Sequence, residues 1–161
     1  MTGLERLLTA LHRASVEFII VGGVAARAHG SGRVTQDIDI VYSRDARNLE
    51  RIVHALHPFK PYLRGAPPGL PFDWSAATLR AGLNFTLTTT AGDIDLLGEI
   101  TGGGGYGDLD AHIVVLSLFG HDTKVLDLDW LIRVKRAAGR PKDLETIAEL
   151  EALREEIDSG E

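Results

Sequence analysis

The chain has 161 residues and a formal net charge of −6, a length that predicts one domain with a full hydrophobic core. It contains no cysteine, which excludes a disulfide framework and a zinc–thiolate site, and its negative charge disfavours a sequence-independent nucleic-acid coat. Because no stretch approaches the ~20 apolar residues of a membrane span and the N-terminus lacks a signal-peptide pattern, we expect a single cytoplasmic domain over residues 1–161 with no membrane segment.

The first predicted elements are a core-packing helix over residues 3–14 and a strand over residues 17–21. The helix is predicted from leucines at helical spacing, and the strand from an apolar run that stops at Gly22-Gly23. These two glycines allow a tight turn and a close approach of the backbone to a ligand. A short helix is expected to follow, and backbone N–H groups at such a turn favour anionic oxygens.

Residues 37–42 are predicted to form a strand because acidic and β-branched residues alternate there. Asp37 and Asp39 then point the same way, with Cα atoms roughly 6.5–7 Å apart. Two carboxylates this close repel each other and need solvent or a cation. Hard oxygen ligands suit Mg²⁺, with Mn²⁺ as a substitute. The alternative is an exposed strand face with two solvated acids.

A helix is expected from residue 43 to residue 57, and an irregular segment follows it. Residues 58–74 contain five of the six prolines, which predicts an extended loop or insertion. Phe72 and Trp74 in this segment pack the loop down or stack a base. The sequence assigns the insertion no role.

A β-hairpin is predicted from residue 83 to residue 97, with a turn at Ala91-Gly92. Its second strand places Asp93 and Asp95 on one face, and either is a candidate for a third carboxylate. The glycine-rich residues 101–107 are expected to form a mobile loop, and residues 113–128 a further β pair.

Two C-terminal helices are predicted over residues 130–158, broken at Gly139-Arg140-Pro141, with Pro141 opening the second. The second helix is expected to bury Leu144, Ile147, Leu150, Leu153 and Ile157. The junction carries a local excess of basic residues, which suggests either a polyanion site or a solvated surface: Arg133, Lys135, Arg136, Arg140 and Lys142.

The motifs resemble those of the nucleotidyltransferase superfamily, which has the DNA polymerase beta-like fold. Val21-Gly22-Gly23 followed by Asp37-Ile38-Asp39-Ile40 is similar to its signature of a strand, a glycine turn and two alternating aspartates. Arg33-Val34-Thr35-Gln36-Asp37 resembles the entry to this motif in a small bacterial branch that includes abortive-infection and toxin–antitoxin members. Gly92 to Leu97 resembles the strand of the third carboxylate, and Leu131 to Leu144 resembles the C-terminal helix pair.

The resemblance implies an α+β fold: a mixed β-sheet with helices packed on one face and a C-terminal helix pair. It also implies a transfer of NMP from an NTP to an unknown acceptor, a protein hydroxyl or an RNA end, by a mechanism that uses two Mg²⁺ ions. The implied setting is the toxin of a toxin–antitoxin pair with an antitoxin partner. The implied catalytic and metal-binding residues are Asp37, Asp39 and Asp95. The implied nucleotide-binding residues are Gly22, Gly23, Arg33, Thr35, Lys135 and Lys142.

The chain departs from this pattern in its short length and in having Gly23 where relatives carry serine. The alternative is a catalytically silent module of the same fold that binds nucleotide or a partner protein. The presence of all three candidate acids argues against that alternative.

Overall fold

A computed structural model describes residues 1–31 and 37–160, apart from the side chain of Lys142. Within these residues a seven-stranded mixed sheet has the order β3-β4-β5-β2-β1-β9-β8. Its strands are β1 (Phe18–Val21), β2 (Ile38–Tyr42), β3 (Tyr62–Leu63), β4 (Asn84–Thr89), β5 (Gly92–Leu97), β8 (Ile113–Leu118) and β9 (His121–Leu126). The predicted mixed sheet is confirmed, and so is the hairpin of β4 and β5.

The centre of the sheet joins strands that are far apart in the sequence. β2 pairs antiparallel with β1 and parallel with β5, so that Asp39 is the register partner of Val21 on one side and of Asp95 on the other. Because side chains alternate along a strand, neighbours in register share a face of the sheet. Asp39 and Asp95 therefore lie together on one face.

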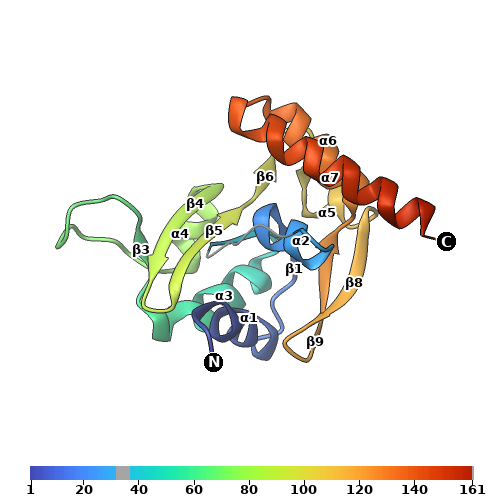
Figure 1. The fold of residues 1–161 in the computed structure, drawn as a ribbon. Coiled ribbons are helices and arrows are strands. Elements are labelled where there is room, and N and C mark those ends of the chain that lie inside the picture. Colours follow the sequence, from blue (N-terminus) through green and yellow to red (C-terminus); the bar gives the residue numbers. More distant parts are fainter. Residues whose placement is uncertain (32–36, 161) are drawn as a thin grey trace.

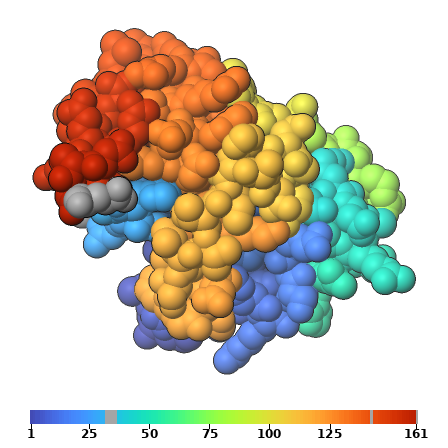
Figure 2. All heavy atoms as spheres, turned by 90° about the vertical axis from the view of Figure 1, so that its right-hand side faces the viewer, coloured from blue at the N-terminus to red at the C-terminus, as the bar shows by residue number. Residues whose placement is uncertain are grey.

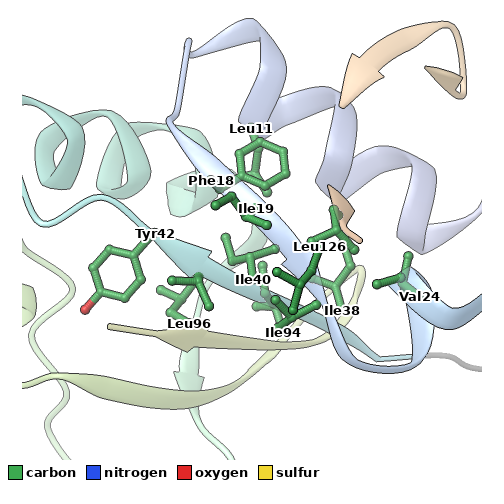
Figure 3. Packing of buried hydrophobic residues seen from close by; sticks show 14 of the residues in the cluster. Leu11, Phe18, Ile19, Val24, Ile38, Ile40, Tyr42, Ile94, Leu96 and Leu126 are labelled. Carbon is green, nitrogen blue, oxygen red and sulfur yellow. The ribbon is translucent and has the colours of Figure 1, made fainter. Parts of the chain in front are cut away.

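The opposite face of these strands forms the hydrophobic core. Ile38 and Ile40 of β2 and Ile94 and Leu96 of β5 are fully buried, and Figure 3 shows their side chains packed together. Each acidic residue is thus flanked in sequence by side chains that are removed from water. This burial fixes the register, since a slip of one residue would turn the aspartates into the core.

The helices form two groups. α1 (Gly3–Arg13), α3 (Ala46–Leu56) and α4 (Ala76–Ala81) pack against one another, whereas α6 (Leu128–Ala138) and α7 (Pro141–Ser159) form the predicted C-terminal pair. Figure 1 shows α1 and α3 at the opposite end of the view from α6 and α7. The shorter elements are α2 (Gly22–Ala28), η1 (His57–Phe59), β6 (Glu99–Ile100), β7 (Gly104–Gly105) and α5 (Tyr106–Leu109).

α2 connects the glycine turn to the C-terminal helix pair. It contacts β1, β2 and α6, and the segment after it reaches α7 through a 2.7 Å hydrogen bond from the Ser31 hydroxyl to Glu149. Figure 2 shows the residues of α2 beside the C-terminal helix on the surface. The C-terminal helices α6 and α7 therefore contact α2 and the segment after it, and α2 in turn contacts β1.

Three local predictions differ from the structure. Residues 58–74 are not loop throughout, because Tyr62–Leu63 forms the edge strand β3 against β4. Residues 101–107 contain β7 and the start of α5, because the glycines there reach positive φ and let the chain fold back on β6. Leu144 and Ile157 of α7 are 67% and 48% exposed, because this helix packs mainly against α6 and buries only its contact side. No helix in the described part of the chain is both long and apolar enough to cross a membrane.

Candidate active site

Asp39 and Asp95 are brought together by the parallel pairing of β2 with β5. Their side chains are neighbours on one face of the sheet, and a hydrogen bond between the two carboxyl groups, which requires a proton on one of them, contributes to the raised pKa of Asp39. Asp37 lies just before β2 and lines the same pocket. Asp37, Asp39 and Asp95 thus line one pocket, although they come from two segments more than 50 residues apart.

Gly22 leaves the space into which the Asp39 side chain extends. Its φ is +69°, a conformation that residues with a side chain rarely adopt, and a Cβ at this position would clash with Oδ2 of Asp39. The first glycine of the pair therefore serves two purposes. It turns the chain from β1 into α2, and it lets the backbone lie directly against the carboxylate.

The carboxyl group of Asp39 is held in an environment that disfavours its charged form. Burial and hydrogen-bond contact with Asp95 raise the pKa of Asp39 to about 7, and the negative charges of Asp95 and Asp37 act in the same direction. Lys135 opposes this effect. A pair of carboxylates this close shares a proton or takes up a cation, and oxygen ligands of this kind suit a divalent metal ion.

These residues form the floor of a pocket of about 830 Å³, a size typical of sites for small ligands. Its walls are contributed by the glycine turn, by β5 and β6, and by the facing sides of α6 and α7. The lining residues are Val21, Gly22, Asp37, Asp39, Asp95, Leu97, Glu99, Ile100, Thr101, Leu131, Val134, Lys135, Ala138, Arg140, Asp143 and Thr146. An acidic floor thus lies beside apolar side chains and a wall that carries cations.

The cationic wall is organised by Asp143, which is 2% exposed. Its carboxylate accepts a 2.8 Å hydrogen bond from Nε of Arg140 and lies 3.4 Å from Nζ of Lys135. The hydrogen bond from Arg140 lowers the pKa of Asp143. Asp143 also accepts from the backbone N–H of Arg140 at the start of α7, so that one carboxylate caps the helix and fixes both cations.

The remaining basic residues of the junction lie elsewhere. Arg133 stacks on Trp130, with its guanidinium carbon 4.6 Å from the ring centroid, and Arg136 pairs with Glu151. Neither lines the pocket. The basic segment therefore contains two kinds of residue. Lys135 and Arg140 line the pocket, whereas Arg133 and Arg136 contact other side chains of α6 and α7.

Arg64 is a residue of the site that sequence reasoning missed. It follows β3 and its guanidinium lies 2.8 Å from Oδ1 of Asp95 and 3.2 Å from Oδ2 of Asp93. A cation inside a segment rich in proline and glycine gives no periodic signal, and its partners are about 30 residues away. The sequence does contain a local pattern that predicts a role for Asp143. An acidic residue two positions after a proline that opens a helix is placed to cap the start of that helix.

Several predicted site residues are not placed by these contacts. Arg33 and Thr35 lie outside the described residues, as does the side chain of Lys142. Gly23 is exposed in the first turn of α2, and neither it nor Asp93 lines the pocket. Among the described residues, no group of three His, Cys, Asp or Glu side chains is close enough to hold a metal ion by itself. Asp39 and Asp95 provide a pair of carboxylates that fits a cation together with other ligands.

Comparison with known proteins identifies the fold. Neither a protein-family model nor a curated protein matches the chain. Among solved structures, ANT(2")-Ia in complex with adenylyl-2"-tobramycin matches with a TM-score of 0.58 and 12% identity, covering 97% of this chain and 95% of that one. The solution structure of the antibiotic-resistance factor ANT(2")-Ia matches with a TM-score of 0.53 and 17% identity, covering 98% and 90%.

A third structure, the Thermotoga maritima protein TM1012, which is assigned as a nucleotidyltransferase, has a TM-score of 0.53 and 16% identity, with coverage of 97% and 91%. The chain therefore has the nucleotidyltransferase fold. The fold that the glycine turn and the alternating aspartates indicated is confirmed over nearly the whole chain. The identities are too low to transfer substrates or site residues.

Proposed function

We propose that the protein is a metal-dependent nucleotidyltransferase that transfers an NMP group from an NTP to an acceptor hydroxyl. One observation carries the proposal: Asp39 and Asp95 are register partners in a pocket that Lys135 and Arg140 also line. Acidic ligands for a cation and basic groups for a polyphosphate are the two requirements of this chemistry. The fold shared with ANT(2")-Ia and TM1012 supports the same class of reaction.

In this proposal the residues have distinct tasks. Asp37, Asp39 and Asp95 would hold Mg²⁺ or Mn²⁺, which supplies Lewis-acid activation of the phosphoryl group when it is bound. Gly22 and Gly23 bring backbone close to the triphosphate, and Lys135 binds it as a point charge. The acceptor oxygen forms a bond to the α-phosphorus. The bond between the α-phosphorus and the oxygen that bridges it to the β-phosphate breaks, and pyrophosphate leaves with that oxygen. Asp95 would either bind the metal ion beside the acceptor hydroxyl, with the acceptor proton passing to solvent, or take the acceptor proton itself.

Arg33, Thr35 and Lys142 remain proposed nucleotide contacts on the strength of the sequence resemblance. The proposed acceptor is a protein hydroxyl or an RNA end, and the proposed setting is a toxin–antitoxin pair in the cytoplasm. ANT(2")-Ia, solved with adenylyl-2"-tobramycin, adds a small-molecule hydroxyl to the acceptors that require testing.

The test is incubation of the purified protein with each labelled NTP and Mg²⁺ or Mn²⁺, in the presence of total RNA, cell extract or a panel of polyhydroxylated small molecules. Transfer of label by the wild type, its loss in Asp39→Asn and Asp95→Asn, and its retention in Asp122→Asn support the proposal. Asp122 is an exposed acid of β9 outside the pocket, which makes it a matched control.

The competing function is a catalytically silent module. It is favoured by the lack, among the described residues, of a group of three metal-ligating side chains close together. A silent module would bind NTP in calorimetry without transferring label to any acceptor. Transfer that depends on Asp39 rejects it.

A further inference from the structure

Arg64 connects the proline-rich segment to the carboxylate pair. The guanidinium makes three polar contacts: 2.8 Å to Oδ1 of Asp95, 3.2 Å to Oδ2 of Asp93, and a 2.8 Å hydrogen bond to the carbonyl oxygen of Leu87. The backbone N–H of Arg64 donates to the carbonyl oxygen of Thr86, which continues the pairing of β3 with β4. Arg64 is therefore fixed by both its backbone and its side chain.

These contacts set the direction of the Asp95 carboxylate. Oδ1 of Asp95 is held by the guanidinium, and Asp95 is the register partner of Asp39 on the neighbouring strand, on the same face of the sheet. Without the cation, two adjacent carboxylates would repel each other, and Asp95 would gain by rotating toward solvent. Nη2 of Arg64 donates hydrogen bonds to Asp95 and to the carbonyl oxygen of Leu87, whereas Nε lies 3.2 Å from Asp93 as an ion pair without a hydrogen bond.

We propose that Arg64 is the positioning residue of the carboxylate pair: it holds Asp95 against Asp39 so that the two side chains face one cation. Groups that orient a ligating carboxylate through its second oxygen typically affect metal affinity or activity by about 10–100-fold. The proline-rich segment of residues 58–74 then has a role in the site. It delivers this arginine to the edge of the site through β3.

A cation beside a metal site can have the opposite effect on metal binding. If Arg64 were only a counter-ion, it would compete with the metal ion, and its removal would tighten metal binding. Positioning and competition thus predict changes of opposite sign. The competing effect is limited here because the guanidinium is engaged by Asp93 and Leu87 as well as by Asp95.

The deciding experiment compares the wild type with Arg64→Ala and Arg64→Lys, and uses Arg51→Ala, an exposed arginine of α3, as the matched control. Crystal structures of the metal-free proteins are the first readout, and we expect the Asp95 carboxylate to leave Asp39 in Arg64→Ala. Calorimetric titration with Mn²⁺ is the second, with an affinity at least about tenfold weaker in Arg64→Ala. Arg64→Lys keeps the charge but not the planar fork, so we expect it to fall between the two.

The kinetic part of the test rests on the proposed function. In Arg64→Ala we expect kcat to fall by about tenfold or more while KM for NTP changes little, because the triphosphate contacts are untouched. An Asp95 carboxylate that stays in contact with Asp39 in Arg64→Ala overturns the inference, and so does Mn²⁺ binding as tight as in the wild type or tighter. If the wild type neither binds Mn²⁺ nor transfers label, the proposed function fails, and the crystal structures still decide the role of Arg64.

Discussion

At the scale of single residues, the site depends on how closely Gly22 approaches Asp39. Gly22→Ala would place a methyl group against Oδ2 of Asp39 and force a positive φ on alanine. We expect a loss of about 2–4 kcal/mol in the free energy of unfolding, measured by urea denaturation, from backbone strain and the clash together.

Gly69→Ala is the control for this substitution. Its φ is +86°, but nothing lies within 4 Å of the added Cβ, so it reports the backbone strain alone. A loss of stability no larger in Gly22→Ala than in Gly69→Ala would show that the contact with Asp39 is not tight.

The raised pKa of Asp39 makes the stability of the metal-free protein depend on pH. The pKa is about 7 in the folded protein, whereas an unperturbed aspartate has a pKa of about 3.9. Between these values the folded state binds more protons than the unfolded state, so the free energy of unfolding falls as pH rises. We expect a decrease on the order of 2–4 kcal/mol from pH 4 to pH 8 attributable to this group, seen in urea titrations with EDTA.

Asp39→Asn should remove this part of the pH dependence, because asparagine does not titrate. Metal binding should show the reverse trend, with affinity for Mn²⁺ rising up to about pH 7 as Asp39 loses its proton. Identical pH profiles for the wild type and Asp39→Asn would contradict the assigned pKa.

The proposed binding of the triphosphate by Lys135 can be tested directly. Lys135 lines the pocket, and its charge acts on Asp39. Because a charge-assisted contact is worth about 1.5–3 kcal/mol, Lys135→Ala should weaken NTP binding about tenfold or more in calorimetry with Mg²⁺. Arg136→Ala, which alters a cation outside the pocket, should leave the affinity unchanged. Unchanged NTP affinity in Lys135→Ala would reject the triphosphate role.

At the scale of elements, α7 is held by one side only. Leu150 is 1% exposed and Leu144 is 67% exposed, in a helix whose main contact is with α6. We expect Leu150→Ala to lower the free energy of unfolding by about 2–4 kcal/mol and Leu144→Ala to change it by less than about 0.5 kcal/mol. Thermal and urea unfolding measure both changes. Comparable losses of stability in the two variants would contradict the packing of α7 through the side that carries Leu150.

At the scale of the whole molecule, the acidic floor of the pocket should make folding sensitive to metal ions. A cation that binds only the folded state adds ~2.7 kcal/mol at 100 times its Kd, which raises Tm by about 5–10 °C in a chain of this size. Mg²⁺ or Mn²⁺ should produce this rise in the wild type and a smaller one in Asp39→Asn. An equal response of the two proteins would place the metal elsewhere.

The central elements of this fold could be predicted from local patterns in the sequence. Alternation at residues 37–42 and 92–97 gave the two acid-bearing strands, because burial of one strand face imposes a period of two on the sequence. Gly22 marked the turn because a positive φ demands glycine. The break at Gly139 and Pro141 marked the C-terminal helix pair, because an αL residue ends one helix and proline opens the next.

The contacts among the site residues depend on the pairing of strands that are distant in the sequence. The parallel pairing of β2 with β5 brings Asp95 to Asp39, and the edge strand β3 brings Arg64 to Asp95. The same structure directs Lys135 and Arg140 into the pocket and turns Arg133 and Arg136 away. Local periodicity records which face of an element is buried. It does not record which distant element covers that buried face, because the packing of the whole chain decides this.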